Sequence, residues 1–172
     1  IVQAKRVLEI FKEMSQIPRE SGNEKGISDY IVNFAKNLGL EVHQDDQFNV
    51  VIKKPASPGY ENRPSIILQG HIDMVCVRDH DSNHDFSKDP IANIIEGEWM
   101  HADHTTLGAD NGMGGAMMLA ILEDDSQQHG PMQLLFTTNE ETGMDGAFAI
   151  KEGQVSGDYL LNLDTEVEHD FT

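Results

Sequence analysis

The sequence predicts an α/β fold in which a mostly parallel sheet is flanked by helices. Three short apolar runs, bounded by turn signals, lie at 65–69, 132–137 and 159–163. Each is nearly continuous in hydrophobicity, which is typical of strands covered on both faces. Helix signals separate them at 114–122 and 147–151. Strands that alternate with helices in this way favour parallel pairing through helical crossovers.

The segment before these runs predicts two helices and an extended stretch. Residues 3–14 carry apolar side chains at helical spacing. After a polar break, Ser28 is placed to cap a second helix over 29–38, and Gly39 follows where a helix-ending glycine belongs. Residues 48–52 form an apolar extended stretch before a loop rich in proline and glycine. We therefore expect two helices and one further strand ahead of the parallel part.

The composition excludes several classes of partner. The 172 residues contain 30 Asp and Glu against 12 Lys and Arg, a formal net charge of −18. A chain this acidic does not bind nucleic acid or an anionic membrane through bulk electrostatics. No apolar run approaches the ~20 residues of a membrane span. The single cysteine, Cys76, rules out an internal disulfide and indicates a reducing compartment, so we expect a cytoplasmic protein.

Polar segments follow each predicted strand and also open the central helix. In open α/β sheets, ligands bind beyond the carboxyl ends of the strands, so these segments are expected to converge at one edge. They supply one histidine and five carboxylates: His71, Asp73, Asp110, Glu140, Glu141 and Asp164. Crowded carboxylates repel one another unless a nearby positive charge compensates them. The set therefore predicts a divalent cation, and imidazole with carboxylates suits zinc, manganese or cobalt.

The spacing of these residues suggests a division of roles. In an extended segment His71 and Asp73 point to the same side, so Asp73 could accept the proton of the far ring nitrogen. In the pair Glu140-Glu141, one carboxylate can bind metal while the other acts as a general base. Asp110, between loop and helix, could bridge two metals. Each motif alone has a commoner structural explanation, such as a local hydrogen bond, a turn or a solvated pair, and it is their conjunction that indicates a site.

With these motifs together, the chain resembles peptidase family M20, a family of co-catalytic metallopeptidases. Within it, the likeness is greatest to the branch of bacterial aminoacyl-histidine (Xaa-His, carnosinase-like) dipeptidases, and it spans almost the whole chain. The matching stretches are 68–75, 105–112, 138–144 and 161–166, with a weaker one at 11–19.

The resemblance implies two divalent metal ions, zinc first, with cobalt or manganese as alternatives. It makes His71 and Asp164 ligands of the first metal, Glu141 a ligand of the second, and Asp110 the bridge between them. It also makes Glu140 the general base and Asp73 the residue that orients His71. The implied reaction is hydrolysis of dipeptides, Xaa-His dipeptides in particular, by a water that the two metals activate. The implied partner is a small dipeptide, with no nucleic acid and no membrane.

The sequence also departs from the family pattern. Family enzymes are much longer, carry a second domain for lid closure or dimerisation, and use a late histidine at the second metal. We therefore expect residues 1–172 to be the N-terminal part of the catalytic domain, without that lid or dimerisation domain and without the C-terminal part of the catalytic domain. The full-length protein is expected to be a homodimer. His169 is a weak candidate for the missing ligand, and His104 is expected on the surface.

Two alternatives to the dipeptidase stay open at this point. The chain could be a truncated, non-catalytic fragment that binds metal only. It could also be a related M20 aminopeptidase or a deacylase of N-acyl amino acids, because the pocket that selects the substrate side chain is not readable from the sequence.

Overall fold

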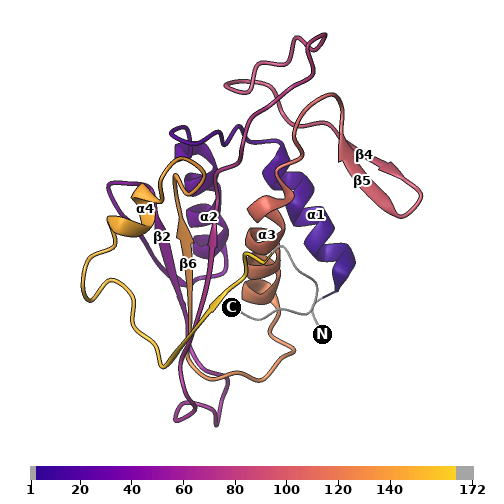
Figure 1. The fold of residues 1–172 in the computed structure, drawn as a ribbon. Coiled ribbons are helices and arrows are strands. Elements are labelled where there is room, and N and C mark those ends of the chain that lie inside the picture. The colour runs from indigo at the N-terminus through magenta and orange to yellow at the C-terminus, as the bar shows by residue number, and fades with distance from the viewer. Residues whose placement is uncertain (1–2, 166–172) are drawn as a thin grey trace.

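The computed structural model describes residues 3–165 and places helices on both faces of a twisted sheet (Figure 1). The helices are α1 (Ala4–Ser15), α2 (Lys25–Asn37), α3 (Ala109–Glu123) and α4 (Asp145–Phe148). The strands are β1 (Glu41–Gln44), β2 (Val50–Lys54), β3 (Ile66–His71), β4 (Asn93–Glu96), β5 (Trp99–Ala102), β6 (Met132–Thr137) and β7 (Tyr159–Asn162). None of the helices within the described range is long and apolar enough to cross a membrane.

The main sheet has the strand order β1-β2-β6-β3-β7. Strands β6, β3 and β7 pair in parallel, whereas β2 is antiparallel to both of its neighbours, β1 and β6. Because β1 runs against β2, it points in the same direction as β6. The predicted α/β fold with a mostly parallel sheet is therefore confirmed, and the carboxyl ends of β3, β6 and β7 lie at one edge.

One face of the sheet is covered by α1, α2 and α3, which share a continuous apolar core with it. Its fully buried members include Phe11, Ile31, Leu119, Leu134 and Phe136. Burying each such side chain contributes about 1.5–3 kcal/mol relative to leaving it in water. α3 packs on this face, and its start carries one of the candidate site residues, Asp110.

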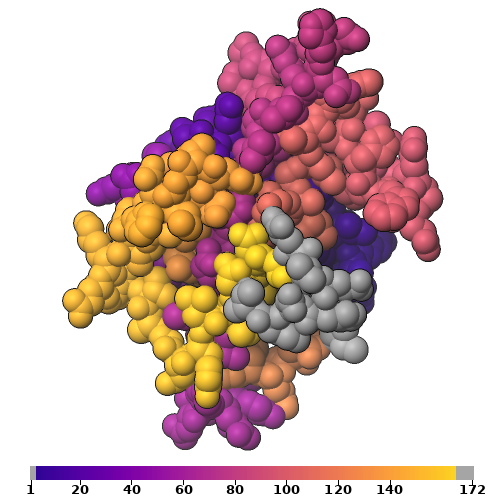
Figure 2. Space-filling view, in the orientation of Figure 1, coloured from indigo at the N-terminus to yellow at the C-terminus, as the bar shows by residue number. Residues whose placement is uncertain are grey.

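The opposite face is covered less completely. A small cluster of Val51, Ile67 and Leu135 packs there against Ile150 and Val155, in and after the α4 region. Figure 1 shows α4 on the other side of the sheet from α1 and α3, and Figure 2 shows the yellow β7 segment at the surface. The prediction that all three apolar strands are covered on both faces is thus wrong for β7. It is an edge strand that pairs only with β3 in the described range. Its apolar residues are exposed: Tyr159, Leu160 and Leu161.

The start of α2 also differs from the prediction. The helix begins at Lys25 with Glu24 at the N-cap position, so Ser28 lies inside its first turn. The Ser28 hydroxyl donates to the carbonyl oxygen of Phe48 at 2.7 Å, which anchors α2 to the turn before β2. Phe48 has a positive φ of 64°, so the strand starts only at Val50. Ser28, which the sequence suggested as a helix cap, therefore makes a tertiary hydrogen bond instead.

The hairpin formed by β4 and β5 was not predicted. Its strands pair antiparallel across a tight turn in which Gly97 has a φ of 63°. In Figure 1 it projects to the right, away from the sheet, and Trp99 is 79% exposed. Because its side chains are mostly exposed or only partly buried, the hairpin lacks the continuous apolar signal that revealed the core strands.

Candidate metal centre

The structure brings the predicted site residues together at the carboxyl edge of β3, β6 and β7. The Nε2 atom of His71 lies 3.1 Å from Oδ1 of Asp110, 3.7 Å from Oδ2 of Asp164 and 3.9 Å from Oε2 of Glu140. His71, Asp110 and Glu141 each offer one ligand atom, and these atoms lie within 4.8 Å of one another. Carboxylates from three other segments thus surround one ring nitrogen of a buried histidine.

The other ring nitrogen of His71 faces Asp73. Nδ1 lies 3.2 Å from Oδ1 of Asp73, and both side chains are essentially buried, at 1% and 0% exposure. A proton on Nδ1 donated to Asp73 leaves the lone pair of Nε2 directed at the carboxylates. The same-side geometry expected from the alternation His71-Ile72-Asp73 is what the structure has.

Asp73 also holds the segment that carries the glutamate pair. Its Oδ1 accepts the backbone N–H of Glu140 at 3.1 Å, and its Oδ2 accepts that of Glu141 at 3.2 Å and the Ser21 hydroxyl at 2.7 Å. Burial alone would raise the pKa of Asp73, but the hydrogen bonds from His71, Ser21 and these two N–H groups outweigh it and lower the pKa to about 2. Sequence reasoning assigned Asp73 to His71 alone and missed this second contact.

The electrostatics of the site show a shortage of positive charge. Burial lowers the pKa of His71, but the neighbouring Asp73, Asp164 and Asp110 more than compensate and raise it to about 9. Burial and the negative charges of nearby carboxylates raise the pKa of Glu141 and of Asp164, against the opposing effect of His71. Carboxylates that repel one another around a single imidazole fit a divalent cation.

Asp110 lies in the irregular first residues of α3. Asp110 and Asn111 have non-helical dihedral angles, and the peptide bond between them is cis. Further along, a Cβ on Gly114 would lie 2.7 Å from the carbonyl oxygen of Leu163. Glycine there lets α3 approach the segment that carries Asp164, which brings the two acidic segments to the same edge.

The other histidines considered from sequence do not join the site. His104 is exposed, as expected, and pairs with Asp79 at 2.7 Å between Nδ1 and Oδ2. His169 lies outside the described residues. Within the described range, the group able to share an ion contains a single histidine, His71.

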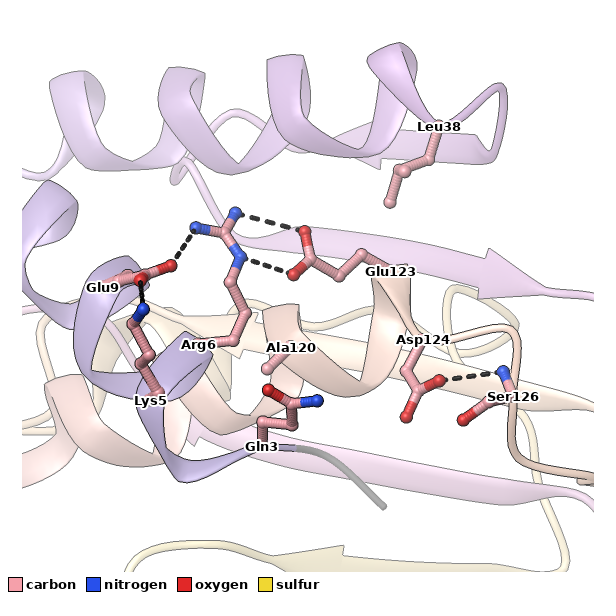
Figure 3. A pocket seen from close by; sticks show the side chains of 9 residues that line it. All are labelled: Gln3, Lys5, Arg6, Glu9, Leu38, Ala120, Glu123, Asp124 and Ser126. Atoms are coloured by element: carbon pink, nitrogen blue, oxygen red, sulfur yellow. Dashed lines mark hydrogen bonds and ion pairs between the residues drawn. The ribbon is translucent and has the colours of Figure 1, made fainter.

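Two cavities differ in their relation to this site. A cavity of about 590 Å³ adjoins it on the α4 face and is lined by Gln69, Thr137, Glu140, Asn162 and Asp164, among others. This volume is within the range of small-molecule sites. A larger cavity, about 670 Å³, lies at the far end of α3, beside the Arg6–Glu123 ion pair (Figure 3). It contains none of the candidate residues.

The family follows from comparison with known sequences. Residues 67–169, more than half of the chain, match the model of peptidase family M20/M25/M40. The chain belongs to this family. The match spans every residue of the predicted metal centre and confirms the resemblance drawn from the motifs.

Individual relatives agree with this assignment. The chain is 47% identical over 160 residues to the cytosol non-specific dipeptidase of Escherichia coli, covering 93% of this chain and 33% of that protein. The crystal structure of an aminoacylhistidine dipeptidase from Vibrio alginolyticus superimposes with a TM-score of 0.93 at 46% identity, covering 96% of this chain and 34% of that one. A tripeptidase from Staphylococcus aureus gives 0.80 at 26% identity, with coverages of 96% and 44%. The chain thus spans about a third of the length of the Escherichia coli and Vibrio alginolyticus relatives.

Proposed function

We propose that this chain is the metal-binding part of an M20 dipeptidase that hydrolyses dipeptides with two divalent metal ions. The observation that carries the proposal is the environment of His71. One ring nitrogen is held by the buried carboxylate of Asp73, and the other faces Asp110, Glu140 and Asp164 within 3.9 Å. A buried imidazole oriented by a carboxylate and open toward other carboxylates is the arrangement of a metal ligand with its supporting partner.

We further propose that the site holds two ions. His71 and Asp164 would hold the first ion, Glu141 the second, and Asp110 both through its two oxygens. The side chain of Asp110 is 59% exposed, and its Oδ1 lies 3.1 Å from Nε2 of His71. Bound divalent ions supply Lewis-acid activation of the peptide carbonyl and lower the pKa of water. Zinc is the ion we propose first, with cobalt and manganese able to use the same donors.

Glu140 is the proposed general base. Its carboxylate lies beside the ligand set, and its side chain is 37% exposed, so it can reach a water next to the ions. It takes the proton of the attacking water on a carboxylate oxygen and passes it to the nitrogen of the leaving amine. Asp73 holds Glu140 through its backbone N–H, which leaves the Glu140 side chain available for this transfer.

The names of two relatives support a proposal for the substrate class. One is described as a non-specific dipeptidase and the other as an aminoacylhistidine dipeptidase. We propose dipeptides, with Xaa-His dipeptides preferred, and the cavity of about 590 Å³ beside Glu140 as the space for them. We further propose that residues 1–172 form the N-terminal part of the catalytic domain, that the whole protein is a homodimer, and that it is cytoplasmic, as the name of the Escherichia coli relative indicates for that protein.

One observation favours a second candidate, a chain that binds metal without catalysis. In the described range the second ion would have only Glu141 and Asp110 as ligands, with no second histidine in the group. If the remaining ligand of the second ion lies outside residues 1–172, this chain by itself would bind one ion firmly and would not catalyse hydrolysis.

Hydrolysis assays test the proposal. The chain is loaded with Zn²⁺, Mn²⁺ or Co²⁺ and incubated with Xaa-His and other dipeptides, beside a Glu140→Gln variant. We expect the variant to bind the same amount of metal and to lose about 10²–10⁴-fold in kcat, because the base is removed and its shape is kept. Equal activity in both proteins would refute the role of Glu140. Full metal binding with no activity in either would favour the second candidate.

A further inference from the structure

The loop between α1 and α2 contacts three of the four segments that build the metal centre. We name residues 19–24 of this loop the clamp loop. It contacts the end of β3, the segment before α3 and the segment after β6. None of its side chains belongs to the ligand group around His71.

Arg19 joins two of these segments through one side chain. Its Nη1 donates to the carbonyl oxygens of Ile72 and Asp73, both at 3.2 Å, and its Nη2 donates to that of Gly108 at 2.5 Å. The first two carbonyls follow the histidine ligand, and the third lies two residues before Asp110. A guanidinium is planar and rigid, so its donors fix the spacing between the carbonyls they bind.

Arg19 is an unusual core residue. It is only 2% exposed, its hydrogen bonds go to backbone carbonyls, and its Nε has no hydrogen-bond partner among the described residues. Burial lowers the pKa of Arg19 to about 10. A buried charge carries a desolvation cost, which is offset here by hydrogen bonds to three carbonyl oxygens of two site segments. The guanidinium therefore ties these two segments to each other.

The start of α3 is shaped around this side chain. A Cβ on Gly112 would lie 2.6 Å from Nη2 of Arg19, and a Cβ on Gly108 would also clash with the same nitrogen. The two glycines flank Asp110, so the guanidinium packs against the backbone on both sides of that residue.

Ser21 and Glu24 extend the same support to the other segments. The Ser21 hydroxyl donates to Oδ2 of Asp73 at 2.7 Å. The buried Glu24 carboxylate accepts the backbone N–H of Asn139 at 3.0 Å, directly before the glutamate pair, and that of Gly22 at 2.9 Å. Both contacts reach backbone or supporting atoms of the site and leave the ligands free.

We propose that Arg19, Ser21 and Glu24 are positioning residues. They set the spacing of the metal ligands and thereby the metal affinity. The clamp loop holds the segments that carry His71, Asp110 and the glutamate pair at fixed distances from one another. This inference rests on the proposed metal centre, and its test uses a readout other than catalysis.

The test is a Co²⁺ titration of the chain, followed by the visible absorption of the bound ion. Arg19→Met removes the guanidinium and keeps the length of the side chain. We expect the dissociation constant for Co²⁺ to rise about 10- to 100-fold, with a changed absorption band, as for outer partners of metal ligands. Ser21→Ala, which removes one hydrogen bond, is expected to raise it by a smaller factor and covers the case in which Arg19→Met fails to fold.

Lys54 provides the matched control. Like Arg19 it is a buried cation that binds carbonyl oxygens of α3, but at the opposite end, with Nζ at 2.8 Å from Leu122 and 3.0 Å from Asp124. Lys54→Met should leave Co²⁺ affinity and absorption unchanged. Wild-type affinity in both Arg19→Met and Ser21→Ala, or an equal loss in Lys54→Met, would overturn the inference. A wild-type chain that binds no Co²⁺ would overturn the proposed function as well.

Discussion

The acidic residues at the two ends of α3 differ in the positive charge that surrounds them. At the C-terminal end, Glu123 accepts both Nε and Nη2 of Arg6, at 2.5 and 3.2 Å, and Lys54 binds the last carbonyls of the helix (Figure 3 shows the Arg6 pair). At the N-terminal end, one histidine faces Asp110 and two other carboxylates.

The helix dipole explains part of this difference. Cations are favoured at a helix C-terminus and anions at an N-terminus. The dipole acts only within the first and last turns, whereas the pKa of Glu141 and of Asp164 is raised by burial and by the surrounding carboxylates. At the C-terminal end the charge of Glu123 is balanced by Arg6. At the N-terminal end the carboxylates outnumber the single histidine, so added positive charge is needed. A few of the acidic residues behind the net charge of −18 thus form the candidate site, and most of the others lie on the solvated surface.

Removing the histidine should have the largest effect on metal binding at the N-terminal end of α3. His71→Ala takes away the nitrogen donor, so we expect the dissociation constant for Zn²⁺ to rise more than about 100-fold, beyond the effect of losing an outer partner. Isothermal titration calorimetry measures it. Glu123→Gln at the other end of α3 serves as the control and should bind Zn²⁺ with unchanged affinity; a comparable loss there would show that the two ends are not distinct.

The pH dependence of the metal-free chain should show the same asymmetry. The pKa of Asp73 in the folded chain, about 2, is below its ordinary value of 3.8, so its contribution is present above pH 3.8 and is lost as the pH falls toward 2. The pKa of His71, about 9, is above its ordinary value of 6.5, so its contribution is present below pH 6.5 and is lost as the pH rises through 9.

Urea unfolding across this pH range tests the prediction. We expect greatest stability between about pH 4 and 6.5, and a loss of about 2 kcal/mol on the acid side from Asp73. Asp73→Asn should remove the acid limb, because it removes the titrating carboxylate, and should reduce the alkaline limb, because Asp73 is the first of the carboxylates that raise the pKa of His71. A wild-type curve that stays level from pH 6.5 to 9.5 would contradict the charge balance described for His71.

The smallest effect is expected at the C-terminal end of α3. Arg6→Met breaks a partly exposed ion pair with Glu123, and such pairs contribute about 0.2–1 kcal/mol. The free energy of unfolding should fall by no more than this, and raised salt should reduce the difference. Zn²⁺ affinity should not change; a weakened affinity would mean that this end of α3 also supports the metal centre.

Much of the fold was predictable because its signals are local. The apolar runs predicted at 132–137 and 159–163 correspond to β6 and β7, and the helix predicted at 114–122 lies within α3. The hairpin of β4 and β5 was missed because its side chains are poorly buried. Ser28 was misread because its hydroxyl bonds to a residue twenty positions away.

The candidate site was predictable to the extent that strand topology dictates it. Parallel strands place their carboxyl ends together, so His71, Glu140 and Asp164 could be expected to meet. Arg19 and Glu24 could not be found in this way. Apart from the N–H of Gly22, their side-chain partners are backbone atoms more than fifty positions along the chain, and no periodicity or spacing reports such contacts.

The most direct test of the central claim is the metal content of the intact chain. The protein is loaded with Zn²⁺, freed of excess by gel filtration, and measured by elemental analysis together with native mass spectrometry. We predict about one firmly held zinc ion per chain, because the described residues offer a second ion only Glu141 and Asp110, and we predict well under one in His71→Ala. A wild-type chain that retains no zinc, or a variant that retains as much as the wild type, would contradict the claim that the N-terminal end of α3 is a metal centre.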